Sequence, residues 1–525
     1  MTAAGSRVKT ACSHIAKILR RATLLSLAVG VATYLWFAIP YWWKSPIITK
    51  RYVSDFNHEV AKIPVEQRAW PLLRKARILD PIPDEAIFPK GAPTSTCWDD
   101  PQFVESEKFL VERRESVELI RIASSRLRLG ALLWCDSELL LDSSKSPEQR
   151  VASVPDIDLD ANPWMLSLVY QYMGTVRSSA RLLALEMCIA GEQGDAARCI
   201  EDFKAMLGLA RLVADPPVLV GQLVGVAVES FAINRFETVA ATYPGLFSVE
   251  DWKEVNRVLG AGSFSSQGLD LEWEKRQLDD WAQRIFAPGS SGSMTAEGYR
   301  FLGAGASQPS GEFEIYVLGP ALATRFGTRA DYDAFRDQMF EAAAKEAKKP
   351  THLRDEAWRN ELEAQSEKPN APRSSRVIAI LLPSLNKAMF AADKVKLEFE
   401  VAKAVTHIER FRLEHKRYPT TLSELKDAVG AELPQDIFSG RPICCRFAEG
   451  GLTLYSVGVD RVDDGGKPGR NDEVVQKWET ASTLAGLSER QFEPYQGDWI
   501  LWPPREVEWA DGSTHKLVPT TSPDK

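Results

Sequence analysis

The chain has 525 residues, of which 44% are apolar and 26% are charged, and its formal net charge at pH 7 is −8. This is the composition of an ordinary globular protein, with enough apolar material for a core and a length that suits two to four domains. The negative net charge gives no electrostatic reason to expect a nucleic-acid partner.

The first predicted element is an uncharged apolar run over residues 22–43, ATLLSLAVGVATYLWFAIPYWW. As a helix it would be about 33 Å long, at about 1.5 Å per residue, which is enough to cross a hydrocarbon core about 30 Å thick. The residues before it, 1–21, carry lysines and arginines but no acidic residue, and the first acidic residue after it is Asp55. Residues 1–21 are therefore expected to stay in the cytoplasm. The basic residues are Arg7, Lys9, Lys17, Arg20 and Arg21.

A cleaved signal peptide is the alternative to this anchor. The apolar core of a signal peptide is usually about 7–15 residues long and ends in small residues, whereas this run ends in Tyr41, Trp42 and Trp43, which suit the far membrane interface. We expect an uncleaved single-pass anchor in a bacterial inner membrane, with the bulk of the chain in the periplasm. The other apolar runs, at 216–233 and 377–390, contain polar residues or proline and are expected to be buried helices.

The seven cysteines are compatible with a periplasmic location. Cys188 and Cys199 flank a predicted helix turn and are a candidate disulfide pair, whereas the neighbours Cys444 and Cys445 would point to opposite faces of a strand. No CxxC motif occurs, so neither a zinc ribbon nor a thioredoxin-type site is supported. The pairing of Cys97, Cys135 and the four cysteines named above stays open.

Residues 55–285 are expected to form an α-helical domain. Its clearest pattern is a helix, a turn with the sequence GEQGDAA, and a second helix that begins at an Asp195 cap and stops at Pro216. The stretch weakly resembles a tetratricopeptide-type hairpin, but no second copy follows at a period of about 34 residues, so an irregular helical bundle is the favoured alternative. The apolar stripe of the second helix is Ala196, Cys199, Phe203, Met206, Ala210 and Val213.

Residues 286–375 are expected to be a loop-rich and charged helical connection, and residues 376–510 a small α+β domain. In the latter, a long helix of about 30 residues stops at Tyr418, a capping box over 421–424 starts a short helix, CCRFAEGGLTLYSVG forms a hairpin, and DWILWPP supplies a last strand. Residues 511–525 are expected to be a disordered tail. The fold class is thus mainly α, with an N-terminal transmembrane helix, an irregular bundle of helical hairpins and a C-terminal α+β domain.

The order of parts from about 375 to 475 resembles the major pseudopilin of type II secretion systems. The resemblance is carried by RFRLEHKRYPTTLSEL, LPQDIFSGRP and LYSVGVDRVDDGG…ND, and it implies a long helix on a small antiparallel sheet with a calcium ion in the loop after the last strand. The apolar run before this helix is short and contains Pro383, so we expect a borrowed fold and not a fibre subunit. The whole layout also resembles single-span bacterial membrane proteins of unassigned activity that join a helical region to such a module.

The resemblance makes the acidic loop a candidate structural Ca²⁺ site. Several carboxylates on one short loop repel each other unless a cation neutralises them, and calcium takes six to eight hard oxygens. The alternative is a bare acidic turn whose charges are screened by water. The loop is not an EF-hand, because Val462 occupies position 3 of a loop that begins at Asp460. The candidate ligands are Asp460, Asp463, Asp464, Asn471 and Asp472.

No catalytic motif of the HExxH, GxSxG, GxGxxG or P-loop type occurs. Paired carboxylates such as Asp279 and Asp280 lie on a predicted amphipathic helix, where a solvated face is expected, although a Ser/His/Asp set built from distant residues stays open. We therefore expect no enzyme but a membrane-anchored periplasmic interaction or scaffold protein, associated with a secretion or envelope system. Its expected partners are the membrane and an envelope protein. The alternatives are an envelope hydrolase and a type II secretion pseudopilus component.

Overall fold

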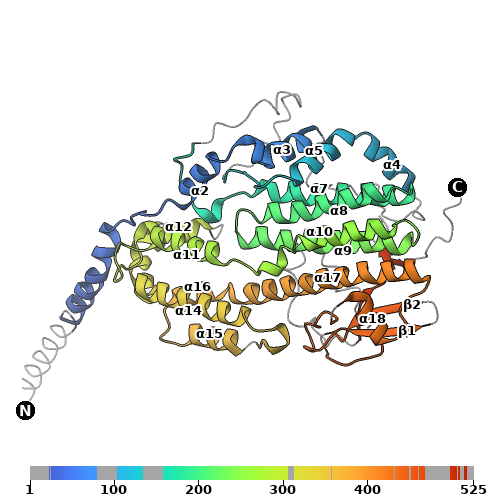
Figure 1. The fold of residues 1–525 in the computed structure, drawn as a ribbon. Coiled ribbons are helices and arrows are strands. Elements are labelled where there is room, and N and C mark those ends of the chain that lie inside the picture. Colours follow the sequence, from blue (N-terminus) through green and yellow to red (C-terminus); the bar gives the residue numbers. More distant parts are fainter. Residues whose placement is uncertain are drawn as a thin grey trace, which may run out of the picture. The chain divides into compact units, whose positions relative to one another are not determined.

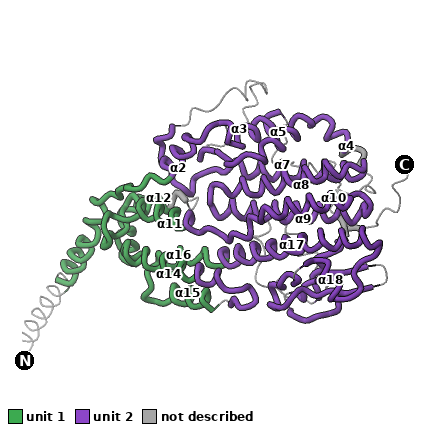
Figure 2. The backbone as a smooth tube through the Cα atoms, in the orientation of Figure 1, with its two compact units in different colours: residues 1–52, 275–342, 356–383 green, residues 53–274, 343–355, 384–525 purple. Residues whose placement is uncertain are grey.

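The computed structural model describes residues 23, 25–79, 103–133, 158–305, 312–355, 357–430, 432–448, 451–458, 460–467, 497–504, 506–508 and 514–516. Within them the fold is mainly helical, with a small three-stranded antiparallel sheet near the C-terminus (Figure 1). The predicted mainly α class with a small antiparallel sheet is thereby confirmed. The chain forms two compact units, each built from separate stretches of sequence (Figure 2).

Unit 1 comprises residues 1–52, 275–342 and 356–383. The region predicted as a loop-rich and charged helical connection is mostly helical in its described residues. It contributes to a core, in which the rings of Phe286 and Tyr332 lie 5.6 Å apart. After the apolar helix Leu25–Trp43, its elements are α11 (Glu272–Ile285), α12 (Ala296–Gly305), the π-helix η6 (Glu314–Leu318), α13 (Gly319–Phe326), α14 (Arg329–Ala347), α15 (Ala357–Glu367) and α16 (Arg373–Ala379).

Unit 2 comprises residues 53–274, 343–355 and 384–525. Its helices are α2 (Tyr52–Ala61), η1 (Val65–Gln67), α3 (Trp70–Leu79), α4 (Phe103–Val111), α5 (Arg114–Ser124), η4 (Met165–Ser167), α7 (Gln171–Glu192), α8 (Ala196–Val213), α9 (Leu219–Thr242), α10 (Val249–Gly260), η5 (Ser265–Gln267), η7 (Thr351–Leu353), α17 (Leu382–His415) and α18 (Leu422–Val429). Helices α7, α8 and α9 pack against one another, as Figure 1 shows.

The predicted hairpin around the GEQGDAA turn is confirmed. The Asp195 side chain accepts a hydrogen bond of 3.1 Å from the Arg198 N–H and caps α8, and every predicted stripe residue of α8 is buried except Ala196, which is half-buried. Cys188 and Cys199 are both free thiols. The Cys199 thiol instead donates to the carbonyl of Met187 at 3.3 Å.

Helix α17 joins the predicted helical domain and the predicted α+β domain into one unit. Its residues Ala392 and Val395 form a core with Val226 of α9, and Ser230 of α9 donates to the Glu398 carboxylate at 2.6 Å. A helix of this length measures about 50 Å, whereas strands of four to six residues extend only about 20 Å. The sheet alone cannot cover the helix, so the predicted domain boundary near residue 376 does not separate two cores.

The sheet has the strand order β1–β2–β3, with β1 (Cys444–Ala448), β2 (Gly451–Ser456) and β3 (Trp499–Trp502) all antiparallel. The hairpin and the last strand therefore lie where the sequence predicts them. A separate pair joins β4 (Glu506–Glu508) to β5 (Thr514–Lys516). Residues 514–516 belong to the tail predicted as disordered, whereas here they pair with the neighbouring strand β4.

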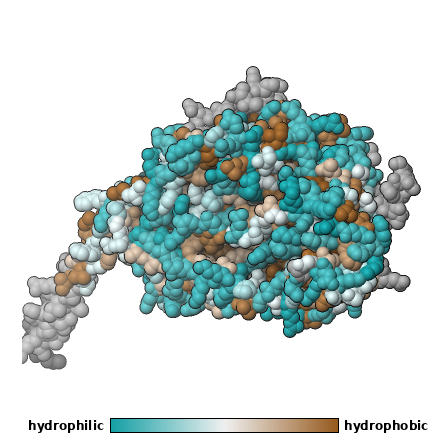
Figure 3. Space-filling view, in the orientation of Figure 1, coloured by the Kyte–Doolittle hydropathy of each residue, from teal (hydrophilic) through white to brown (hydrophobic). Residues whose placement is uncertain are grey.

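Leu25–Trp43 is the one helix in the described part of the chain that is long and apolar enough to cross a membrane. A signal sequence can pass the same test of length and apolar composition. A core helix of a soluble protein would be covered, whereas only 11% of the most apolar window of this helix is buried. Trp36 is 77% exposed, and hydrophobic residues line this helix in Figure 3. Tyr41 is fully buried within unit 1, so its ring packs against protein, and its place at the far membrane interface stays a prediction.

Candidate functional site

Two sites in unit 2 carry clustered polar side chains: the acidic loop after β2 and a pocket at the end of α17. The acidic loop turns at Gly465 and Gly466, whose φ angles are 72° and 73°. Glycine adopts this left-handed conformation without the strain of a side chain. The turn directs successive backbone N–H groups inward, where carboxylates accept their hydrogen bonds.

A buried carboxylate, Asp436, holds the end of β2, from which the chain enters the acidic loop. Its Oδ1 accepts hydrogen bonds from the Phe438 N–H (3.0 Å) and the Ser456 hydroxyl (2.7 Å). Its Oδ2 accepts from the Ser439 hydroxyl (2.9 Å) and the Val457 N–H (3.3 Å). Four donors satisfy the charge, so Asp436 joins the turn before β1 to the end of β2 and is not available as a free ligand.

A second buried carboxylate, Asp498, holds the loop itself. Its Oδ1 accepts from the Asp464 N–H at 3.3 Å and its Oδ2 from the Gly466 N–H at 2.7 Å. Burial raises the pKa of the Asp498 carboxyl, and these two N–H donors oppose that rise. Sequence reasoning missed both Asp436 and Asp498. The available signals are the aspartates inside LPQDIFSGRP and at the start of DWILWPP.

Of the predicted calcium ligands, Asp460 and Asp463 accept hydrogen bonds from groups in or next to the loop. Asp460 accepts from the N–H groups of Val462 and Gly497, both at 3.1 Å. Asp463 Oδ1 accepts from the Tyr455 hydroxyl at 3.0 Å and from a backbone N–H of the loop at 2.9 Å. These bonds occupy part of the acceptor capacity of each carboxylate, because an ionised carboxylate has about four lone-pair sites.

The third predicted ligand, Asp464, is exposed, and its carboxylate accepts no hydrogen bond from any described residue. Asn471 and Asp472 lie outside the described residues. Within the described residues no group of three or more His, Cys, Asp or Glu side chains is placed to hold a metal ion. The hard oxygens of the loop match the ligand preference of calcium, and the calcium site stays a prediction.

Calcium binding to this loop would stabilise the folded chain. With a Kd of about 10⁻⁴–10⁻³ M, about 10 mM calcium adds about 1.4–2.7 kcal/mol to the free energy of unfolding. We expect the thermal midpoint of the chain to rise in calcium and to return in excess chelator, and the rise to disappear in Asp464→Asn. An unchanged midpoint in calcium would contradict the site, and the same rise in magnesium would show non-specific screening.

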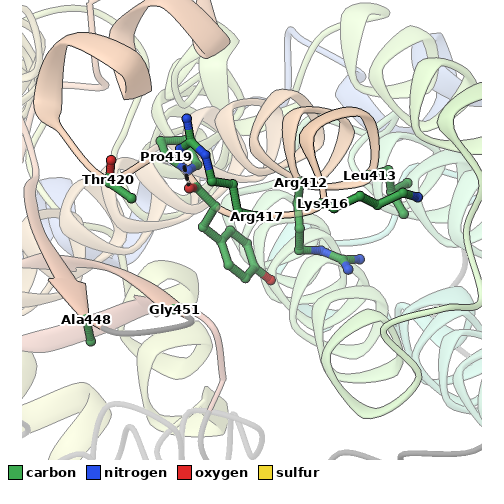
Figure 4. A pocket seen from close by; sticks show the side chains of 9 residues that line it. Arg412, Leu413, Lys416, Arg417, Pro419, Thr420, Ala448 and Gly451 are labelled. Atoms are coloured by element: carbon green, nitrogen blue, oxygen red, sulfur yellow. Dashed lines mark hydrogen bonds between the residues drawn. The ribbon is translucent and has the colours of Figure 1, made fainter.

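The pocket at the end of α17, here called the basic pocket, has a volume of about 430 Å³, within the range of small-ligand sites. Arg412, Lys416 and Arg417 come from the helix end, where cations also complement the helix dipole, and Gly451 comes from the opposite hairpin (Figure 4). Its full lining is Arg412, Leu413, Lys416, Arg417, Tyr418, Pro419, Thr420, Ala448 and Gly451.

Two of the three cations of the basic pocket are paired. Arg412 donates to the Glu409 carboxylate at 2.6 Å, and Arg417 donates to Glu424 through two bonds of 2.9 and 2.5 Å. The Lys416 ammonium is exposed and has no ion pair or hydrogen bond to any described residue. The pocket therefore keeps one uncompensated positive charge.

Charge interactions in the pocket wall stabilise the pairs Arg412–Glu409 and Arg417–Glu424. The Arg417 guanidinium, followed by the Thr420 N–H, lowers the pKa of Glu424 to about 2, so this carboxylate stays ionised at neutral pH. Burial, followed by the charge of Glu409, raises the pKa of the Tyr418 hydroxyl, which donates to Glu409 at 2.8 Å. The geometry suits electrostatic capture of an anionic group by Lys416.

A third polar cluster lies in unit 1 and corrects a sequence prediction. Asp279 and Asp280 were expected on a solvated face, but they are only 8% and 1% exposed. Asp280 pairs with Arg284 at 3.1 Å, and Asp279 lies among cations from α14 and from residues before α2. Helical periodicity reveals the Asp280–Arg284 pair but not the partners of Asp279, because those come from distant parts of the sequence.

Comparison of the chain with protein-family models, curated proteins and solved structures found no match. The resemblance to the type II secretion pseudopilin therefore rests on the quoted motifs alone. The motifs now have defined places: RFRLEHKRYP forms the end of α17 and one wall of the basic pocket, and LYSVGVDRVDDGG forms β2 and the acidic loop.

Proposed function

We propose that this chain is a single-pass protein of a bacterial inner membrane, with a cytoplasmic N-terminus, whose periplasmic part binds an acidic group of an envelope protein in the basic pocket. The observation that carries the proposal is the unpaired Lys416 ammonium in a pocket of about 430 Å³. A pseudopilin-like module, made of α17 and the sheet β1–β3, would present this pocket as part of a rigid interaction or scaffold protein.

The anchor is supported by the physics of the helix Leu25–Trp43. Burial of apolar surface is favourable by about 25 cal/mol per Å², and this helix leaves Leu25, Leu27 and Trp36 more than half exposed. A bilayer would remove that surface from water. The lysines and arginines before the helix favour the orientation with the N-terminus inside.

Binding is favoured over hydrolysis by the chemistry of the pocket wall. The lining offers guanidinium, ammonium and hydroxyl groups, whereas hydrolysis by general acid and base catalysis uses carboxylates or histidine near the substrate. An envelope hydrolase with another site is the alternative. The pseudopilus component is the third hypothesis. It is less favoured because the pseudopilin-like helix α17 has Pro383 in its first turn and is not preceded by a spanning apolar run.

The proposal predicts that reversing one charge will weaken partner capture. We expect Lys416→Glu to reduce the amount of a crosslinked envelope protein recovered with the full chain from membranes by about tenfold or more, since tenfold corresponds to about 1.4 kcal/mol. Lys396→Glu is the matched control, because Lys396 is an exposed lysine on α17 that has no ion pair within the described residues. Equal recovery of the partner with both variants would contradict the proposal.

A further inference from the structure

A short segment of unit 1 exposes apolar side chains beside the apolar helix. Residues 313–318, here called the wedge, consist of Phe313 and η6 (Glu314–Leu318). Phe313 is 67% exposed, and Tyr316, Val317 and Leu318 are exposed as well. Phe313 and Val317 are four residues apart, so their side chains share one face of the helix. Water is an unfavourable environment for such a face.

The sequence explains why the wedge is a π-helix. Pro320 follows it at the second position of α13 and has no backbone N–H, so it cannot donate to a carbonyl four or five residues earlier. The carbonyls affected are those of Tyr316 and Ile315. Loss of a donor and the ring of proline are known causes of local helix irregularity, and π-turns often occur at such places.

The apolar helix supplies the missing donors. The Tyr41 hydroxyl donates to the Ile315 carbonyl at 2.9 Å, and the Trp42 indole N–H donates to the Tyr316 carbonyl at 3.1 Å. The Tyr34 hydroxyl donates to the Val317 carbonyl at 3.1 Å. Backbone groups at membrane depth must be satisfied within the protein. Tyr41 and Trp42 satisfy the two carbonyls that Pro320 leaves short of a donor, and Tyr34 adds a hydrogen bond to the next carbonyl.

Close packing fixes the wedge against the same helix. Gly319 lies directly under Tyr41, and a Cβ atom at this position would lie 2.1 Å from the Tyr41 hydroxyl oxygen. Only glycine therefore permits this approach. The wedge runs beside the stretch from Tyr34 to Trp42, which covers about 12 Å of helix length at the end that would leave the bilayer.

We infer that the wedge inserts into the lipid interface beside the anchor, so that unit 1 has a second membrane contact. This inference rests on the proposed anchor. Lipid is the occupant that the structure favours, because the exposed face is continuous with a helix that a bilayer would cover and because the wedge carbonyls are already satisfied. Glu312 and Glu314 are exposed, and the high cost of charge in hydrocarbon limits the insertion to headgroup depth.

The test uses the full chain in phospholipid vesicles with a photo-crosslinking amino acid placed at one position at a time. We expect lipid adducts, measured by mass spectrometry, at Val317 and at Leu27 of the apolar helix. Val65 of unit 2 is the matched control, since it is an exposed valine outside unit 1, and we expect adduct yield there to be at least tenfold lower.

The outcomes separate the wedge from the anchor. Adducts at Leu27 without adducts at Val317 would overturn the inference and leave the anchor standing, and so would protein adducts at Val317 in place of lipid. Absence of lipid adducts at Leu27 would instead overturn the anchor. Phe313→Ser with Val317→Ser, probed at Leu318, provides a second measurement, and we expect the lipid adduct at Leu318 to fall at least fivefold.

Discussion

Replacement of Asp279 by alanine is expected to lower the free energy of unfolding of unit 1 by about 3 kcal/mol. This is at the lower end of the cost of breaking a buried ion pair. Asp279 accepts hydrogen bonds from Lys50 (2.8 Å), Tyr52 (2.5 Å) and Arg336 (3.3 Å), and it also pairs with Arg329. Alanine leaves these donors without their shared acceptor. The effect is not larger because Arg329 and Arg336 also pair with neighbouring acids of α14.

The pH dependence of this effect follows from the Asp279 pKa. Burial alone would raise it, but hydrogen bonds from Lys50 and Tyr52 and the charge of Arg329 hold the pKa of Asp279 below its ordinary value of 3.8. A lowered carboxyl pKa contributes stability that is fully present above the ordinary value and is lost as the pH falls through the folded-state value. The difference between wild type and Asp279→Ala should therefore be full at pH 7 and shrink only in strong acid.

Hydrogen exchange gives the local measurement for this prediction. We expect amide protection in α11 and α14 to fall by about a hundredfold in Asp279→Ala, which corresponds to about 3 kcal/mol. Glu361→Ala is the control, because Glu361 is exposed in the same unit and has no ion pair to a described residue, and such a surface change stays within about 0.5 kcal/mol. Protection equal to wild type in α11 and α14 would refute the role of Asp279.

Local patterns were sufficient to predict the elements that depend on neighbouring residues. The stripe of α8, its Asp195 cap and the hairpin β1–β2 all follow from spacings of two, three or four residues. The sequence of the long helix α17 also carries an apolar stripe at spacings of three and four, and five residues of that stripe are buried. These residues are Val395, Phe399, Ala402, Val405 and Ile408.

Features that depend on distant segments were not predictable from those patterns. The cations around Asp279 lie about 50 and 230 residues away in sequence, so nothing near Asp279 distinguishes it from a surface acid. The division into two units has the same origin, because each unit combines three separate stretches. The core that α17 shares with α9 joins residues 226 and 395.

The acidic loop shows why a count of carboxylates does not define a site. The two aspartates that hold the loop and its approach, Asp436 and Asp498, are buried and accept hydrogen bonds from backbone or hydroxyl donors. The predicted ligand Asp464 is the one whose carboxylate faces solvent with no described donor. The basic pocket was not predictable from the sequence for a related reason. The motif RFRLEHKRYP contains several cations, and Lys416 is recognised as the unpaired one only when the partners of Arg412 and Arg417 are known.

Replacement of Glu237 by glutamine is expected to stabilise the chain at neutral pH. Glu237 lies on α9 beside apolar side chains that include Phe203, Trp252 and Val405, and its carboxyl has no hydrogen bond or ion pair to a described residue. Burial, followed by the charge of Glu398, raises the pKa of Glu237 well above its ordinary value of 4.5. The folded chain therefore holds a proton there that the unfolded chain releases.

The sign of the pH effect follows from this proton. Because the folded state binds more protons above pH 4.5, wild-type stability falls as the pH rises, by at most about 1.4 kcal/mol per pH unit from this group. Glutamine resembles the protonated acid and does not titrate. Glu237→Gln should thus match wild type at pH 4 and exceed it increasingly up to the folded-state pKa.

Thermal midpoints of the full chain in detergent at pH 4, 5.5 and 7 measure this difference. The matched control is Glu414→Gln, because Glu414 is exposed on α17 and has no ion pair to a described residue, and we expect it to keep the wild-type pH dependence. If Glu237→Gln also keeps the wild-type pH dependence, the Glu237 carboxyl is ionised in the folded chain, and its apolar surroundings do not raise its pKa. A gain that appears equally at pH 4 would instead trace to packing, since both states carry the protonated acid there.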